Sequence, residues 1–143
     1  MNLSKVLLAT LAGGVVNFLL GWLVYVKLMA GFFAANAGSG SGCMRGEDDM
    51  SMMWALIVGN LGYALLLAYI FSKWAGIRTA MTGMTAGATI AGLVAFAVDF
   101  TMLGVANINN LNSAIVDVLV SAVLGAACGA VVGWVLGYGE NRG

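Results

Sequence analysis

Residues 114–138 are AIVDVLVSAVLGAACGAVVGWVLGY, an apolar run that contains one charged side chain, Asp117. About 20 apolar residues in a helix cross the hydrocarbon core of a bilayer, so a run of this length predicts a membrane-spanning helix. Three similar runs precede it in the chain. Strands of a membrane barrel would instead alternate apolar and polar residues over about ten positions, and none of the four runs has that pattern.

The composition of the whole chain also favours a membrane protein. Of its 143 residues, 62% are hydrophobic and 8% are charged, whereas a soluble domain carries about a quarter of charged residues. At ~20 residues for each span, four spans and their connections account for nearly the whole chain. The sequence therefore predicts an all-α membrane protein, a four-transmembrane-helix up-down bundle that forms a single domain over residues 1–143.

The expected spans cover about residues 6–33, 52–73, 79–105 and 113–138. The first apolar run is longer than the ~7–15 residues of a signal-peptide core, so we expect it to remain as a helix. Proline, the commonest cause of a sharp helix kink, is absent, and four fairly straight helices are therefore expected. An outer loop at 34–51 joins the first two spans, and its residues 38–42 (GSGSG) have the composition of a flexible linker.

The basic residues are divided unequally between the two sides of the predicted bundle. Basic residues in short loops favour the cytoplasmic side of a membrane. The count therefore predicts a cytoplasmic (inner) membrane protein with both termini in the cytoplasm. The side that holds the termini carries Lys5, Lys73, Arg78 and Arg142, and the opposite side carries Lys27 and Arg45.

Glycines at four-residue intervals mark one face of the fourth span. Four-residue spacing places side chains on one face of a helix, and glycine there lets a second helix approach closely. Two interpretations remain open, which are packing within one chain and contact with a second copy or a partner subunit. The expected helix-packing glycines are Gly125, Gly129, Gly133 and Gly137 in the fourth span, Gly83 and Gly87 in the third, and Gly13 and Gly21 in the first.

Charged side chains inside the apolar runs are a second pattern. Lys27, Asp99 and Asp117 all lie about 30 Å along their helices from the end that holds the termini, at ~1.5 Å per residue. An unpaired charge in hydrocarbon is costly, so an ion-paired cluster near the outer interface is one interpretation, with an ion or proton site as its function. The alternative is that Lys27 extends to the interface and that Asp117 favours a helix N-terminus. Asn17 and Asn60 lie nearer the midplane, where we expect interhelical hydrogen bonds.

The outer loop contains the residues that a soft metal would use. The thiol of Cys43 and the thioethers of Met44 and Met50 suit Cu(I), but their spacing follows no metal-binding motif, so we expect neither a metal nor a cofactor. Histidine is absent, and no nucleophile–base pair is apparent, so the sequence predicts no enzyme. The net charge is zero, which gives no reason to expect nucleic acid as a partner.

Three stretches are similar to those of small four-span bacterial proteins. They are GGVVNFLLGWLVY (13–25), ALIVGNLGYALLLAYIFSKWAGI (55–77) and VDVLVSAVLGAACGAVVGWVLG (116–137). On these the chain resembles an uncharacterised family of small four-span bacterial integral membrane proteins. The resemblance implies a bacterial cytoplasmic membrane and implies no activity or site residues.

Three hypotheses for function follow from these features. The first is a non-catalytic membrane protein that acts through helix–helix association, as an accessory subunit or a homo-oligomer, with the glycine face of the fourth span as the interface. The second is a small oligomeric channel or transporter that uses Lys27, Asp99 and Asp117. The third is an outer-facing Cu(I)-binding protein. The partners expected under the first are the lipid bilayer and either a second copy or another membrane protein.

Overall fold

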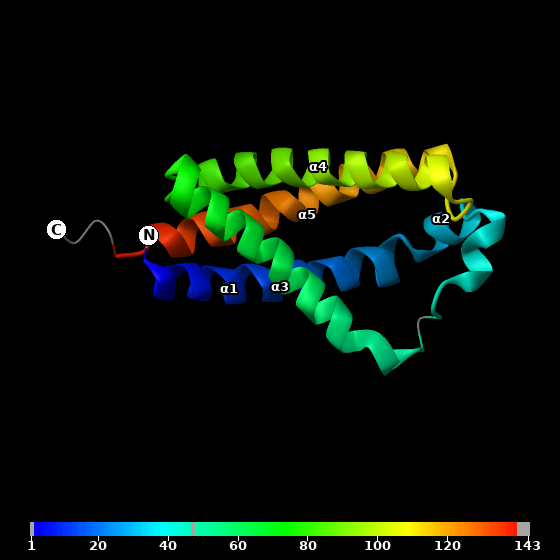
Figure 1. Cartoon of the computed structure of the whole chain (residues 1–143), viewed down its shortest axis with the longest axis horizontal. Coiled ribbons are helices and arrows are strands. Elements are labelled where there is room, and N and C mark those ends of the chain that lie inside the picture. The colour runs from blue at the N-terminus through cyan, green and yellow to red at the C-terminus, as the bar shows by residue number, and fades with distance from the viewer. Residues whose placement is uncertain (1, 47, 140–143) are drawn as a thin grey trace.

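The structure, a computed structural model, describes residues 2–46 and 48–139 (Figure 1). Its α-helices in these ranges are α1 (Leu3–Trp22), α2 (Ala30–Ala35), α3 (Met53–Ile70), α4 (Ala80–Val105) and α5 (Leu111–Gly137). Four helical segments, Leu3–Leu28, Met50–Ala75, Ala80–Val105 and Leu111–Gly137, are long and apolar enough to cross a membrane. The all-α four-helix bundle is thus confirmed. Arg142, which entered the count of basic residues, lies outside the described ranges.

Two of the four spans end in wider, π-helical turns. These turns cover Leu23–Leu28 after α1 and Phe71–Ala75 after α3. At the first, the amide of Met29 donates to the carbonyl of Val24 at 2.7 Å. The helix is interrupted at Met29, and α2 begins at the next residue. The expectation of one straight helix over 6–33 is therefore wrong, because a π-type bond spans one residue more than an α-type bond and changes the course of the helix.

The end of the bundle opposite the termini is closed by two connections that dock on each other. The amide of Gly38 donates to the carbonyl of Ile108 at 2.6 Å, and the amide of Gly40 donates to that of Asn107 at 2.7 Å. A Cβ atom at Gly38 would overlap the Asn107 carbonyl. The expectation of a flexible linker at 38–42 is wrong, because glycine serves there to let two backbones come together.

Helices α4 and α5 pack against each other through glycines. A Cβ atom at Gly83 would overlap the carbonyl of Gly129, and a Cβ atom at Gly129 would overlap the carbonyl of Gly83. The two backbones therefore approach with no side chain between them, as small residues allow in membrane helices. The glycine face of α5 is covered by α4 of the same chain, which is the first of the two interpretations left open. The other glycines in this contact are Gly87, Gly125 and Gly133, while Gly137 meets the backbone of Arg78, which precedes α4.

The core lies near the end that holds the two termini, where α1, α3 and α5 meet. Phe71 and Leu67 are its largest fully buried side chains. Gly13 lets α1 approach α5, since a Cβ atom there would lie 2.6 Å from Cγ2 of Val132. The core residues are Val6, Ala9, Ala64, Leu67, Ala68, Phe71, Cys128, Val132, Val135 and Leu136.

Helix α3 crosses the bundle obliquely and diverges from α4 towards its own N-terminus (Figure 1). Residues 54–59 are all exposed, and no atom lies within 4 Å of the Cβ positions of Gly59 and Gly62. Gly21 of α1 also has nothing within 4 Å of its Cβ position. The expected packing role of Gly21 is therefore wrong, because the divergence of α3 leaves this glycine at the wall of a cavity.

Candidate functional site

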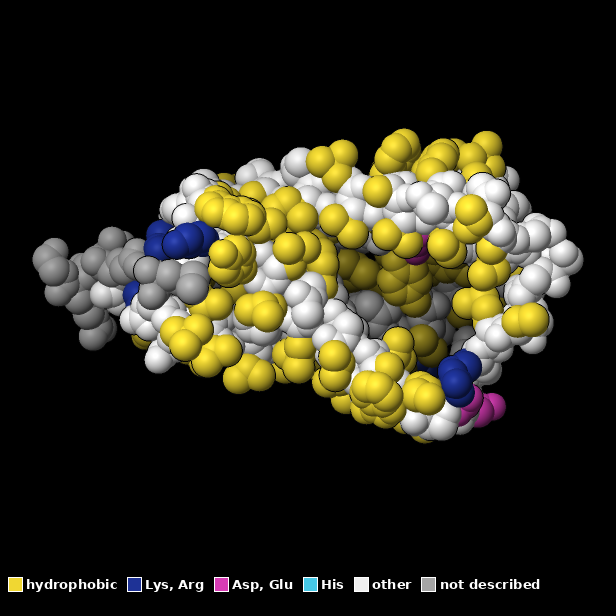
Figure 2. Space-filling view, viewed as in Figure 1, with side chains coloured by type: hydrophobic (Ala, Val, Ile, Leu, Met, Phe, Trp, Pro, Cys, Tyr) yellow, Lys and Arg dark blue, Asp and Glu magenta, His cyan; other side chains and the backbone are white. Residues whose placement is uncertain are grey.

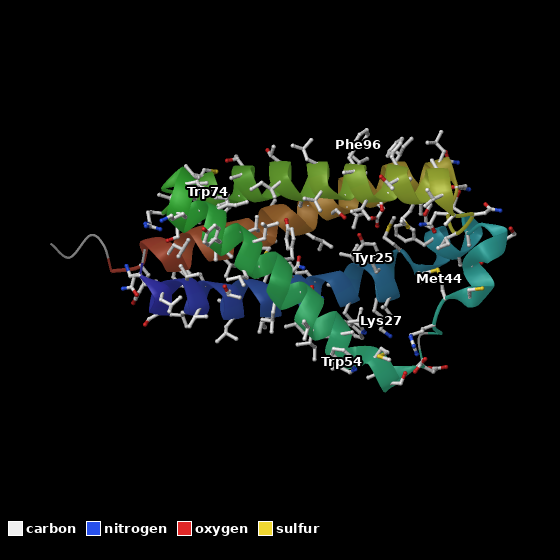
Figure 3. All side chains as sticks on the ribbon, in the orientation of Figure 1. Tyr25, Lys27, Met44, Trp54, Trp74 and Phe96 are labelled. Atoms are coloured by element: carbon white, nitrogen blue, oxygen red, sulfur yellow. The ribbon has the colours of Figure 1, made fainter. Side chains whose placement is uncertain are left out.

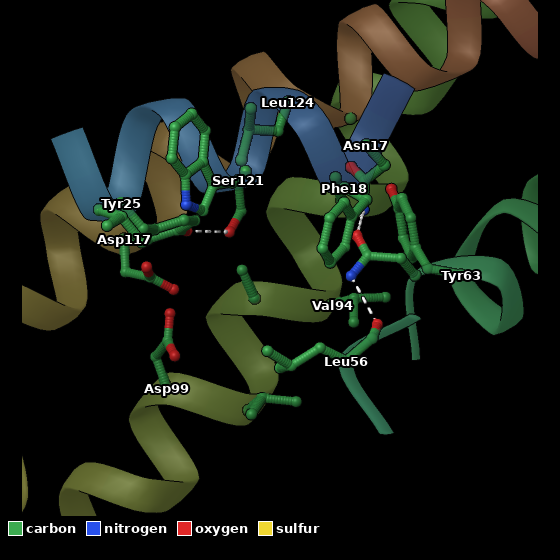
Figure 4. Close-up of a pocket in the computed structure, with 18 of the residues that line it drawn as sticks. Asn17, Phe18, Tyr25, Leu56, Tyr63, Val94, Asp99, Asp117, Ser121 and Leu124 are labelled. Carbon is green, nitrogen blue, oxygen red and sulfur yellow. Dashed lines mark hydrogen bonds between the residues drawn. The ribbon is translucent and has the colours of Figure 1, made fainter. Parts of the chain in front are cut away.

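A cavity of about 480 Å³ lies between α1, α3, α4 and α5, in the half of the bundle away from the termini (Figure 4). It exists because α3 separates from α4 there. Figure 2 shows this side of the molecule hollowed between the two helices, with hydrophobic side chains around the hollow and an acidic side chain at its upper edge. Sites for small molecules have volumes of about 300–1,000 Å³ and mostly apolar walls, so the cavity has the size of such a site.

Two carboxyl groups, those of Asp99 from α4 and Asp117 from α5, face each other in the cavity wall (Figure 4). Oδ2 of Asp99 is buried and has no hydrogen-bond partner. Among residues 2–46 and 48–139, no lysine or arginine lies within salt-bridge distance of either carboxyl. The pair is therefore a concentration of acidic oxygen atoms that no cation of the described chain offsets.

A tyrosine and a serine complete the polar side of the cavity. The hydroxyl of Tyr25 lies 3.4 Å from Oγ of Ser121, and either can be the donor. Asp117 lines the same cavity as this tyrosine. Tyr25 belongs to the π-helical turn Leu23–Leu28, and such turns are frequent at functional sites of membrane and soluble helices.

The asparagines expected to join helices do so at the inner edge of the cavity. Nδ2 of Asn17 on α1 donates to Oδ1 of Asn60 on α3 at 2.7 Å. Nδ2 of Asn60 in turn donates to the carbonyl of Leu56 at 2.7 Å within α3. Nearby, the hydroxyl of Tyr63 also lines the cavity, is buried and has no hydrogen-bond partner. The described chain thus leaves the hydrogen-bonding capacity of this buried hydroxyl unsatisfied.

Lys27 does not join the two aspartates. It is exposed, and its Nζ lies 5.2 Å from the centroid of the Trp22 ring, a distance typical of a cation–π contact. Figure 3 shows Tyr25 and Lys27 on opposite sides of the helix. The sequence placed the lysine at the correct depth, but two residues of separation turn it away from the face that carries Tyr25.

The outer loop holds the residues considered for copper. Cys43, Met44 and Met50 are exposed, and within the described ranges no group of three or more His, Cys, Asp or Glu residues is placed to hold a metal ion. The polar contacts of this loop involve Asp49 instead, which accepts from Arg45 Nη1 at 2.8 Å and from the Ser51 amide at 3.0 Å. These contacts lower the pKa of Asp49 below its usual range, with the Ser51 hydroxyl as the largest cause.

The sequence indicated two carboxylates and two amides of this site and did not indicate Tyr25, Ser121 or Tyr63 as site residues. A signal for one of them was present. Ser121 follows Asp117 by four residues, which places both on one face of α5. Tyrosines near the end of a span are also common as interface anchors, and that general role gave no reason to assign Tyr25 to a site.

The three stretches 13–25, 55–77 and 116–137, on which a family resemblance was expected, lie in α1, α3 and α5 and in the turns that end α1 and α3. In the structure they supply core packing and much of the cavity wall. Apolar helices of this kind occur in many membrane proteins, so four spans alone do not identify a family. Comparison with known proteins finds no matching family model, no similar curated protein and no similar solved structure.

Proposed function

We propose that this chain is a small membrane transporter or carrier, with its substrate site in the cavity that Asp99 and Asp117 line. The observation that supports the proposal is the pair of facing carboxyl groups in a cavity of about 480 Å³. Ionisable residues inside membrane spans are rare, and where they occur they mark ion or substrate pathways. The proposal involves binding and movement of a solute and no covalent step.

The orientation that we infer for the bundle determines which half of the membrane holds the cavity. The excess of basic residues on the side of the termini supports a bacterial cytoplasmic membrane with both termini inside. The cavity then lies in the outer half of the membrane. Since it does not extend to the core at the other end, transport requires either a second conformation or a second copy of the chain.

The sequence alone favoured association through the glycine face of α5, and the contacts of that face within the chain make this proposal weaker. Gly129 and Gly83 are in backbone contact within the chain, so a second copy reaches them only if α4 leaves. A different surface supports association as a homo-oligomer or accessory subunit. The outer half of α3 is exposed over 54–59, and Gly59 has open space beside it.

A flux assay tests the transport proposal. The purified chain in proteoliposomes is expected to move at least one member of a panel of H⁺, Na⁺, K⁺ and labelled organic cations faster than protein-free vesicles do. Asp99→Asn is expected to reduce that flux to the protein-free level, because it removes one of the two carboxyl groups in the cavity. Asp49→Asn, in the outer loop, is the matched control and should leave it unchanged. No flux with any solute, or equal flux in Asp99→Asn, contradicts the proposal.

The association proposal has its own measurement. Gly59→Leu is expected to change the mass of the protein in mild detergent, because it fills the open side of α3 where a neighbour would pack. Gly104 also has nothing within 4 Å of its Cβ position but lies on α4, so Gly104→Leu is the control. An unaltered mass in both variants removes α3 as the interface.

A further inference from the structure

We infer that the ligand of this cavity is an organic cation with an apolar body, and that it enters from the lipid between α3 and α4. The inference takes its site from the proposed function and adds the chemical class of the ligand. It concerns equilibrium binding, so it stands or falls separately from transport.

The charge of the site is the first argument. Asp99 and Asp117 face each other (Figure 4), and the described part of the chain gives neither a lysine nor an arginine within salt-bridge distance. When both carboxyls are ionised, their like charges repel strongly in a medium of low dielectric constant. A positive charge placed between them removes that repulsion, whereas a neutral ligand leaves it, and an anion increases it.

The arrangement of oxygen atoms separates an organic cation from a metal ion. Ca²⁺ takes about six to eight oxygen ligands, and Mg²⁺ requires octahedral coordination. Here the polar groups beside the carboxyls are the hydroxyls of Tyr25 and Ser121 on the same wall. The walls around them are apolar, with side chains such as Val94 and Leu124. Only two acidic side chains meet here, and among residues 2–46 and 48–139 no group of three or more His, Cys, Asp or Glu side chains is placed to hold a metal ion.

The apolar walls fit the body of the ligand. Phe18 and Tyr25 present aromatic rings to the cavity, and such rings attract cations through their faces. Tyr63 also lines the cavity at its inner edge, where its hydroxyl is buried and has no hydrogen-bond partner. A molecule with a positive centre near the aspartates and an apolar remainder satisfies both parts of the site.

The position of the opening indicates the route. The hollow lies on the side of the bundle, between α3 and α4, and not at its end (Figure 2). In a membrane the side of the bundle faces lipid. A solute that partitions into the bilayer reaches this opening directly, and an amphipathic cation does so more readily than a hydrated metal ion, which keeps its water.

Tetraphenylphosphonium is a suitable probe, since it is a bulky aromatic cation with a permanent charge. Its binding to the full chain in mild detergent is measured by equilibrium dialysis. Saturable binding is expected, and Asp99→Asn and Asp117→Asn should each weaken it by about tenfold or more. Triphenylphosphine oxide, a neutral compound of related shape, should bind at least about tenfold more weakly. Asp49→Asn is the control that should bind as the wild type does.

A second variant tests the cavity without altering its charge. Gly21 has open space at its Cβ position and lines the cavity, so Gly21→Leu should fold, fill part of the cavity and lose tetraphenylphosphonium binding. Asp99→Glu keeps the charge and should retain binding where Asp99→Asn loses it. Circular dichroism and size-exclusion profiles verify that each variant is folded.

Five results would overturn the inference: no saturable binding of tetraphenylphosphonium, equal binding of the neutral compound, unchanged binding in Asp99→Asn, equal loss in folded Asp99→Glu and Asp99→Asn, or unchanged binding in Gly21→Leu. Binding of tetraphenylphosphonium without any flux would contradict the proposed transport but would be consistent with the inferred class of ligand. Flux of inorganic ions without tetraphenylphosphonium binding removes the ligand class and leaves transport.

Discussion

The close contact between α4 and α5 predicts that one added methyl group lowers the stability of the fold. In Gly129→Ala the new Cβ atom would lie 2.8 Å from the Cα atom of Gly87 and would overlap the carbonyl of Gly83. Ordinary van der Waals contact begins at 3.4 Å. The nearest atoms are backbone atoms of a helix and have no rotamer that moves them away. The two helices must therefore separate by at least about 0.6 Å at this point, enough to forfeit part of the dispersion energy of the whole contact.

The magnitude follows from two opposing effects. Overpacking of a close contact costs about 1–3 kcal/mol, while replacing glycine by alanine inside a helix favours folding by up to about 1 kcal/mol. Gly104→Ala serves as the control for the second effect, because Gly104 lies in the last turn of α4 and has nothing within 4 Å of its Cβ position. The free energy of unfolding of Gly129→Ala should therefore fall below that of Gly104→Ala by about 1–3 kcal/mol.

The assay is unfolding by sodium dodecyl sulfate in mixed micelles, followed by far-ultraviolet circular dichroism. Gly129→Ala should unfold at a lower detergent fraction than the wild type, and Gly104→Ala at the same fraction or a higher one. The double variant Gly83→Ala/Gly129→Ala should lose less than the sum of the single losses, because one separation of the helices relieves both overlaps. Equal midpoints for Gly129→Ala and Gly104→Ala would refute the reasoning, since the backbone contact would then contribute nothing to stability.

Two further predictions concern polar groups. Asn17→Leu should lower the free energy of unfolding by about 0.6–1.7 kcal/mol, because it removes the 2.7 Å bond to Asn60; the same unfolding assay measures it, and an unchanged midpoint would contradict it. Asp49 should titrate below the ordinary range of aspartate, since the Ser51 hydroxyl, the Ser51 amide and Arg45 lower its pKa. A lowered folded-state pKa contributes stability above the unfolded pKa, which is lost as the pH falls through the folded pKa. Carboxyl NMR titration checks this, with Ser51→Ala expected to raise the pKa, and an ordinary value in the wild type would show that the loop contacts are absent in solution.

The number and type of the long helices were predictable because hydrophobic length alone determines them. The tilt of α3 was not predictable. Apart from Asn60, its residues 53–70 are apolar on every side, so no apolar face of the helix marks the direction of the core. The sequence consequently contained no signal that α3 leaves α4 and opens a cavity.

The charged residues also show what the sequence could not predict, which is the rotation of each helix about its axis. Counting residues along a helix gives depth, and it placed Lys27, Asp99 and Asp117 at one level. Which residues meet at that level depends on the rotation of each helix, and the rotation depends on packing elsewhere. The close fit of α4 on α5 turns Asp99 towards Asp117, while the π-helical turn after α1 presents Tyr25 to them and leaves Lys27 outside.

The cavity begins where the small residues of α1 no longer bring α3 close. At the inner end, the Cβ position of Gly13 lies 3.4 Å from the Cβ atom of Ala64, so the two helices are in contact. One turn further out they are joined by the hydrogen bond between Asn17 and Asn60, and one turn beyond that Gly21 faces open space. The amide pair therefore stands at the boundary between packed core and cavity. A ligand that fills the cavity binds the divergent arrangement of α3 in preference to a closed one. A substitution that draws the outer half of α3 onto α4 should therefore make the free energy of ligand binding less favourable by the amount of free energy with which it stabilises the closed form.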